Sequence, residues 1–431
     1  MRIYSTLQIS FYADGLSGAR RVLIHAPKWR HSLLVLCGVR SWLVALLLVC
    51  GPLVVSAFAQ QLPPAAARQF RQALEHMRTE RYLLAEQGLS QLERQFPDHA
   101  DIQQALAMVL AVQGKYVEAI AVFERLRERN PESYEVAYYL AVAYQAAGDF
   151  EKARAEAQKA LRQWQTADLH HLLGQVNEEL KNYLEAVQHF QRAAELEPSE
   201  RNIYDLGYEF LVHWTWDAAL AVFQKGVELS PKSERLWLGL ATVYYAQGDY
   251  NQATQSILEA TAVVPDNMRA YDLLAAAYPL SHGHTEAVQQ RLRQFWHQQP
   301  DNPWANYYYG LTRGKPPDRH PSKAELAEAI RLLQRATALK PDLAEAHYQL
   351  GVLFSEQRQW QQAVPALEAA VRWKPDYVAA HYRLALAYRR TGKPDQAQAM
   401  LARYQKLKAE QDSAVERRTA QTTKFIYSLK P

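Results

Sequence analysis

The sequence predicts an all-α protein, a solenoid of about ten helical hairpins. The main evidence is a set of alanines spaced about 34 residues apart: Ala85, Ala119, Ala153, Ala186, Ala219, Ala253, Ala287, Ala329, Ala363 and Ala397. Prolines follow eight of these alanines at a distance of twelve or thirteen residues. The chain is 48% hydrophobic and 11% aromatic, which is enough for a continuous core. A repeat array also explains how 431 residues avoid the limit of about 250–300 residues on a single core.

The N-terminal part of the chain predicts export. Residues 1–40 form a basic leader, and residues 41–59 carry no charge and end in Ala57-Phe58-Ala59. This pattern is typical of a signal peptide cleaved after Ala59, although the segment is also nearly long enough to remain as a membrane anchor. Because the basic residues precede the apolar segment, both alternatives place the rest of the chain outside the cytoplasm, as a periplasmic, secreted or membrane-anchored protein.

Each period then predicts a helix A, a turn and a helix B. A leucine and a small residue, such as Leu240-Ala241, precede most of the alanines by about one helix length. The small residue and the alanine allow the two helices to approach closely, and the apolar spacing is that of amphipathic helices. Glycines suited to a left-handed helix end occur at Gly114, Gly148, Gly248 and Gly392. N-cap residues precede helix A at Ser133, Thr166, Ser199, Ser233, Asn267 and Asn302.

This pattern resembles the tetratricopeptide repeat. The sixth period has the family's residues in order: Trp237, Leu240, Ala241, Tyr244, Ala253, Ile257 and Pro265. The resemblance covers residues 66–409 and implies a right-handed superhelical solenoid in which helix A lines a concave groove. In this family the second, fifth, ninth and twelfth positions of helix A face the ligand.

Two segments depart from the period. An insertion near residues 314–323 lengthens the eighth hairpin, and its polar, proline-containing composition predicts a protruding loop. Residues 410–431 form a polar tail with little to bury, for which we expect irregular structure.

Charge and motifs exclude several classes of function. Beyond residue 59 the chain has 43 basic and 44 acidic residues, which argues against bulk electrostatic capture of nucleic acid. The body contains no cysteine, because Cys37 and Cys50 both lie in the N-terminal segment. No catalytic or nucleotide-binding motif occurs, and the pair His282 and His284 has no third ligand nearby. We therefore expect no enzymatic activity, no cofactor and no metal.

The candidate partner-binding residues come from the groove positions that the resemblance implies. The second positions change from Asp101, Glu135 and Asp168 to Arg201, Arg235 and Arg269. The acidic residues complement the helix dipole, whereas the arginines oppose it, so they serve either partner recognition or ion pairs between repeats.

Aromatic residues accompany the arginines. Tyr204, Tyr208 and Tyr245 lie on the same predicted face, and tyrosine recurs at the fifth position at Tyr138, Tyr307, Tyr348 and Tyr382. Packing explains most of them, although tyrosine and arginine together are typical of interfaces. Trp214 takes the place of the usual turn glycine, which indicates a second contact site or burial against a neighbouring turn.

These observations predict a non-catalytic scaffold or adaptor that binds a peptide or protein segment in the groove, in a bacterial envelope assembly. The arginines favour an acidic partner or a free carboxylate. The alternatives are a carbohydrate-binding module that uses the groove tyrosines and tryptophans, and a regulatory subunit of an enzyme. The chain lacks the lysine and asparagine pair that co-chaperones of the family use, which disfavours that role. We expect membrane contact only through residues 41–59, if they are retained.

Overall fold

The computed structural model describes residues 62–428, and all regular structure in this range is helical. Twenty α-helices and one short 3₁₀ helix, η2 (Tyr278–Leu280), confirm the predicted all-α class. The helices of the first five hairpins are α2 (Pro64–Arg78), α3 (Tyr82–Gln95), α4 (Ala100–Val112), α5 (Tyr116–Arg129), α6 (Tyr134–Ala147), α7 (Phe150–Leu161), α8 (Ala167–Glu179), α9 (Tyr183–Leu196), α10 (Glu200–Val212) and α11 (Trp216–Leu229). Those of the last five are α12 (Glu234–Gln247), α13 (Tyr250–Val263), α14 (Met268–Ala277), α15 (Thr285–Gln298), α16 (Pro303–Gly314), α17 (Lys323–Leu339), α18 (Ala344–Glu356), α19 (Trp360–Trp373), α20 (Val378–Arg390) and α21 (Pro394–Ser428).

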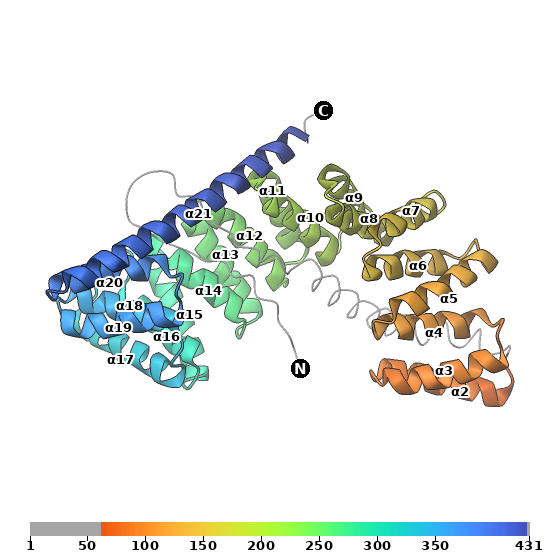
Figure 1. The fold of residues 1–431 in the computed structure, drawn as a ribbon, viewed down its shortest axis with the longest axis horizontal. Coiled ribbons are helices and arrows are strands. Elements are labelled where there is room, and N and C mark those ends of the chain that lie inside the picture. The colour runs from red at the N-terminus through yellow and green to blue at the C-terminus, as the bar shows by residue number, and fades with distance from the viewer. Residues whose placement is uncertain (1–61, 429–431) are drawn as a thin grey trace. The chain divides into compact units, whose positions relative to one another are not determined.

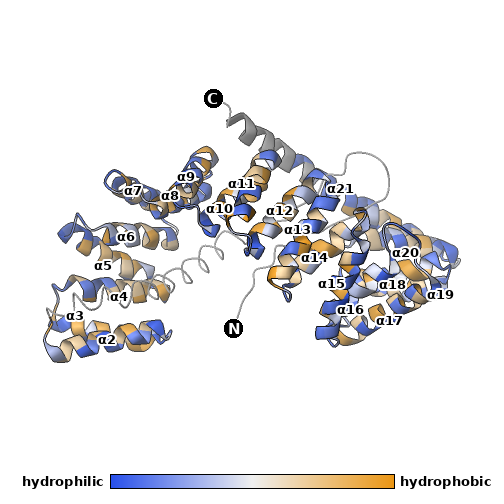
Figure 2. Ribbon diagram, turned by 180° about the vertical axis from the view of Figure 1, so that it is seen from behind, coloured by the Kyte–Doolittle hydropathy of each residue, from blue (hydrophilic) through white to orange (hydrophobic). Residues whose placement is uncertain are grey.

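These helices pair in order into ten antiparallel hairpins, from α2 with α3 to α20 with α21, as the repeat predicted (Figure 1). The described chain divides into two compact units, residues 62–202 and residues 203–428. Within each unit, helix B of one hairpin packs against helix A of the next, as α5 does against α6 and α19 against α20. Hydrophobic and hydrophilic residues mix along the helices of both units, as expected for amphipathic helices (Figure 2).

The predicted N-caps are confirmed at all six positions. Ser133 and Thr166 accept hydrogen bonds from the backbone N–H of Val136 and Leu169, each at 3.3 Å. The side chains of the other four accept from backbone N–H groups at the start of α10, α12, α14 and α16: Ser199, Ser233, Asn267 and Asn302. Each cap satisfies a donor that the first helical turn leaves unpaired, so these residues determine where helix A begins.

The turn between the two helices of a hairpin uses a left-handed residue. The four predicted glycines have φ between +75° and +84°. The same conformation occurs at four residues that are not glycine: Glu80, Lys181, Trp214 and Arg358. They stand at the equivalent turn of hairpins one, four, five and nine, so the hairpin imposes this backbone conformation whichever residue is present.

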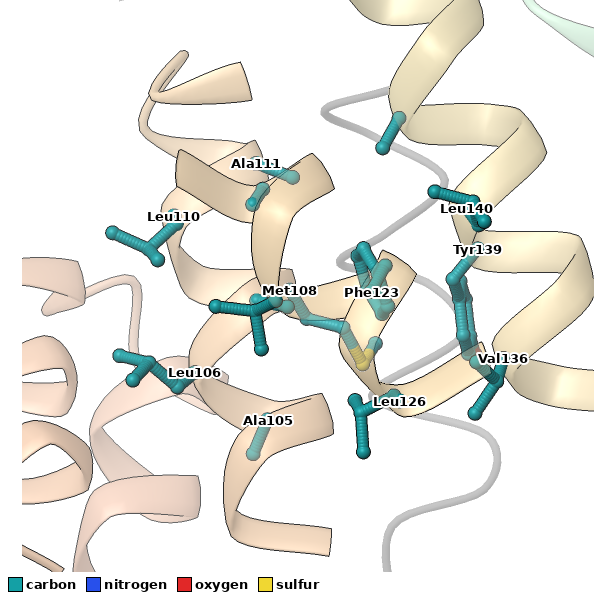
Figure 3. Packing of buried hydrophobic residues seen from close by; sticks show 14 of the residues in the cluster. Ala105, Leu106, Met108, Leu110, Ala111, Phe123, Leu126, Val136, Tyr139 and Leu140 are labelled. Carbon is teal, nitrogen blue, oxygen red and sulfur yellow. The ribbon is translucent and has the colours of Figure 1, made fainter. Parts of the chain in front are cut away.

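Buried side chains from consecutive helices form the core of the first unit. Side chains of α4, α5 and α6 meet between the second and third hairpins (Figure 3). There the rings of Phe123 and Tyr139 stack with centroids 6.1 Å apart. The periodic alanines Ala85, Ala119 and Ala153 are completely buried, which confirms their role at close helix contacts.

The second unit is built in the same way. Ala219, Ala253, Ala329 and Ala363 are completely buried. A Cβ added to Gly351 in α18 would lie 2.4 Å from Cγ of Leu367 in α19. Helix A therefore needs a small residue where the two helices of a hairpin cross.

The predicted register is wrong by one residue in the seventh hairpin. Ala287 is exposed, whereas its neighbour Val288 is completely buried. From the N-cap Asn267 to the left-handed Gly283, which follows η2, the seventh hairpin runs 16 residues, one more than the 15 from Ser233 to Gly248 in the sixth. Val288 thus occupies the position that alanine takes elsewhere.

The insertion in the eighth hairpin is a loop between α16 and α17, but it is tied to the seventh hairpin. The carboxylate of Asp318 accepts hydrogen bonds from Nδ1 of His282 at 3.0 Å and from the hydroxyl of Thr285 at 2.6 Å. At the loop's end, Glu325 caps α17 together with Ser322 and pairs with Arg319 at 2.6 Å. The loop is polar, as predicted, and these contacts hold it against its neighbour.

The expectation of an irregular tail is wrong as far as residue 428. The helix α21 continues to Ser428, because residues 395–428 contain neither glycine nor proline and many good helix formers. Of its side chains that the structure describes, Ala397 and Leu407 are the buried apolar ones. The leader, residues 41–59, both cysteines and residues 429–431 lie outside the described residues. Within the described range, no helix is both long enough and apolar enough to cross a bilayer.

Candidate functional site

The three candidate arginines are divided between the two units. Arg201 belongs to the first unit, and Arg235 and Arg269 belong to the second. Arg201 is largely buried, and its Nη2 lies 2.8 Å from Oδ1 of Asp168. This contact joins the second positions of α8 and α10, so an ion pair between repeats explains Arg201.

Arg235 also forms an ion pair, but it stays half exposed. Its Nη2 lies 3.0 Å from Oδ1 of Asp205 in α10. The guanidinium lies over the ring of Tyr204, with Cζ 3.6 Å from the ring centroid. Stacking on an aromatic face fixes the plane of the guanidinium and leaves donors at its edge, an arrangement suited to a second carboxylate.

Arg269 differs from the other two. It is exposed, and no carboxylate of the described chain lies within ion-pair distance of it. At the position where α10 supplies Asp205 to Arg235, α12 has Gly239. On its own helix, Asp272 accepts a hydrogen bond from the hydroxyl of Tyr308 at 2.5 Å. Burial raises the pKa of Asp272 and the charge of Arg269 opposes this rise, so the two side chains interact without forming an ion pair. Arg269 is therefore the arginine whose charge is most available.

The candidate tyrosines fall into two groups. Tyr245 and Tyr307 are buried in the core of the second unit, so packing explains them. The others are half-buried or exposed, and each contacts a neighbouring ring. Tyr204 pairs with Tyr208 at 5.9 Å, and the remaining pairs are Tyr138 with Tyr134, Tyr348 with Tyr377, and Tyr382 with Tyr404. Tyr382 exposes 41% of its surface, the largest fraction among them.

Trp214 lies in the turn of the fifth hairpin with φ of +59°. It is half-buried and stacks on Trp216 with ring centroids 6.0 Å apart. On α10, Glu209 is buried, with a carboxylate oxygen 3.2 Å from Nε2 of His213. Burial raises the pKa of Glu209 to about 8. The stacking of Trp214 on Trp216 accounts for much of the burial of the Trp214 ring, and a partner contact at Trp214 stays a prediction.

The histidines do not form a metal site in the part of the chain that the structure describes. No group of three or more potential ligands occurs there. His170 and His189 face one another with their Nδ1 atoms 3.0 Å apart, which fits one shared hydrogen bond. Burial lowers the pKa of both, that of His170 to about 4. His282 contacts the insertion loop through Asp318.

Sequence reasoning missed Asp205, the residue that orients Arg235. It lies four residues after Arg201, on the same face of α10. The spacing was visible in the sequence, but the pairing depends on how far adjacent hairpins are staggered. Asp168 pairs from the second position of its helix, whereas Asp205 pairs from the sixth.

Comparison with known families identifies the same type of repeat in several parts of the chain. Models described as tetratricopeptide repeat match residues 70–134, 110–176, 167–200, 215–277 and 354–420, and a model described as TPR repeat matches residues 322–358. Together these matches span well over half of the chain.

The chain shares only about a quarter of the aligned residues with individual relatives. The chain is 24% identical over 272 residues to the BBSome complex member BBS4 of Bos taurus, covering 62% of this chain and 44% of that protein. It is 24% identical over 228 residues to the TPR repeat-containing protein YpiA of Bacillus subtilis, covering 51% and 53%. The chain thus spans about half the length of these relatives.

Among solved structures, the C-terminal part of a TPR repeat-containing protein from Cytophaga hutchinsonii is similar. Its TM-score is 0.47 at 17% identity, with 65% of this chain and 99% of that chain covered.

Proposed function

Because this chain belongs to the tetratricopeptide-repeat family, we propose that it is a non-catalytic scaffold that binds a protein segment on the helix-A face of hairpins five to seven. Proteins of this family generally mediate protein–protein interactions. We define the helix-A face here by Tyr204, Tyr208, Arg235 and Arg269, all in the second unit.

The observation that carries the proposal is the contrast between Arg235 and Arg269. Asp205 and Tyr204 hold Arg235 in place, with half of its side chain exposed. Arg269 stands at the same position of the next hairpin without an equivalent acid. An arginine in the first turn of a helix opposes the helix dipole, so an arginine that forms no ion pair there requires another explanation. A carboxylate supplied by a partner would satisfy it.

The partner is accordingly an acidic peptide or one with a free carboxylate. Arginine beside rigid tyrosine is the composition of interface hot spots. Carbohydrate binding gains no support, because several candidate rings already contact other rings. We also propose that the protein lies in the cell envelope, because residues 1–59 have the sequence pattern of a signal peptide or membrane anchor. A periplasm-active reporter fused after residue 65 tests it, and activity confined to the cytoplasm would contradict it.

The binding proposal is tested by Arg269→Ala. We expect partner proteins that co-purify with the wild-type chain from its host to be lost, with unchanged helicity by circular dichroism. The matched controls are Asp101→Ala and Glu135→Ala, which remove charges at the same position of the second and third hairpins. Asp168 is unsuitable as a control because it pairs with Arg201. Equal loss from Arg269→Ala and the controls would show that this position carries no specific recognition.

A further inference from the structure

The last two hairpins differ in charge from the rest of the array. These hairpins, residues 344–428, contain 13 basic and eight acidic residues, whereas residues 62–343 contain 29 basic and 36 acidic residues. The near-neutral total therefore hides a basic C-terminal region. A positively charged region of this kind attracts an acidic partner.

Part of this charge gathers at the turns that join helix A to helix B in hairpins nine and ten. We call this the basic turn edge and define it by Arg358, Trp360, Arg389, Arg390 and Lys393. Arg390 lies over the ring of Trp360, with Cζ 5.9 Å from the centroid, so the two turns touch. Lys393 lies over the ring of Tyr388 at 5.5 Å.

The charges of the basic turn edge are available to a ligand. All four cationic side chains are exposed, and no carboxylate of the described chain lies within 4.0 Å of them. Three acidic residues lie nearby. Glu368 accepts a hydrogen bond from the hydroxyl of Tyr388 at 2.7 Å. Glu356 is paired with Lys315 at 3.2 Å, and Asp395 stands in the first turn of α21, where it complements the helix dipole. The edge thus remains positively charged.

Arg358 also occupies a position that the fold does not favour for arginine. Its φ is +58°, in a turn where five other hairpins have a left-handed glycine: Gly114, Gly148, Gly248, Gly283 and Gly392. A side chain other than glycine strains this conformation. The charge of Arg358 therefore stands at a site where the repeat itself would be more stable with glycine.

We propose that the basic turn edge binds an acidic polypeptide segment, at a site separate from the helix-A face. The guanidinium of Arg390, which lies over the ring of Trp360, and those of Arg358 and Arg389 keep donors for the bidentate recognition of carboxylates. The edge spans two turns, which suits a short acidic segment. A nucleic acid or an anionic membrane would extend past the edge, and the excess of acidic residues in the rest of the chain would repel it.

The experiment measures binding of a fluorescent glutamate-rich peptide to the full-length chain by anisotropy, with a glutamine-rich peptide as control. We expect Arg358→Gly to weaken binding by about two- to fivefold, the effect of one exposed charge pair, while raising the Tm. Arg358→Gly, Arg389→Ala and Arg390→Ala combined should weaken it by about tenfold or more, if the three effects add. Because the single change is expected to stabilise the fold, unfolding does not explain a loss of binding.

Lys181→Gly is the matched control, because it removes a positive charge from the same left-handed turn position in the fourth hairpin. It should raise the Tm and leave peptide affinity unchanged. Arg269→Ala reports on the helix-A face, so the two proposals fail independently. Equal weakening by Lys181→Gly, or no weakening by Arg358→Gly, would overturn the proposal. Tighter binding of heparin or of phosphatidylglycerol vesicles through the same arginines would also overturn it.

Discussion

The register of the repeat allows a direct test, because substituting leucine for alanine is expected to destabilise the fold at one of two positions that the 34-residue period treats as equivalent and to have little effect at the other. Ala253 is completely buried in the core of the second unit, so Ala253→Leu forces three extra carbon atoms into a close helix contact. Overpacking of this kind costs about 1–3 kcal/mol. Ala287 is exposed, so Ala287→Leu should change the stability by less than about 0.5 kcal/mol.

Thermal unfolding followed by circular dichroism measures both effects. For a unit of the size of residues 203–428, about 1–3 kcal/mol corresponds to a decrease in Tm of roughly 2–12 °C. Val288→Ala provides the reciprocal test, with an expected loss of about 2 kcal/mol from the buried methyl groups and the cavity they leave. An unchanged Tm for Ala253→Leu, or an equal decrease for Ala287→Leu, would refute the register described here.

The insertion loop, the histidine pair and the hairpin turns each allow a further test. Glu325→Gln should destabilise the second unit by about 2–3 kcal/mol in urea unfolding, because Arg313 and Arg319 both lose a charged partner. Burial lowers the pKa of His170 to about 4, so the stability it contributes should be present above about pH 6.5 and be lost towards pH 4. His170→Gln should flatten this pH dependence in urea unfolding curves. Lys181→Gly should raise the Tm, since glycine relieves a strain of about 1–2 kcal/mol.

The period and the caps were predictable because each depends on a small set of residue types at a fixed position in the repeat. A helix start needs a side-chain acceptor, and a close helix contact needs a small side chain, so serine, threonine, asparagine, alanine and glycine mark the hairpins. The one-residue error in the seventh hairpin arose because the period was followed through alanine alone. Pro300 lies thirteen residues after Ala287 but twelve after Val288, the distance found in the other periods that end in proline. The spacing to the proline would have identified Val288 as the buried position.

The partners of the candidate site were less predictable. The second-position arginines were visible in the sequence, but which acid each one meets depends on the stagger of neighbouring helices. Arg201 meets a second-position acid and Arg235 a sixth-position acid. The pattern of tyrosines likewise did not distinguish the buried Tyr307 from the exposed Tyr382, although both stand at the fifth position. Position in the repeat predicts the face of a helix, while burial depends on the neighbouring hairpins.

A repeat protein offers a physical criterion for its functional residues. A residue found at the same position in most hairpins is explained by the stack, as the buried alanines are. A residue that departs from the repeat and lowers the stability of the stack needs another explanation. Arg269 opposes a helix dipole without an ion pair to a carboxylate of the described chain, and Arg358 holds a charge where glycine would be less strained. Trp214 shares the strained conformation but stacks on Trp216, so packing offsets part of its cost. The criterion therefore favours the two arginines over the tryptophan as contacts for a partner.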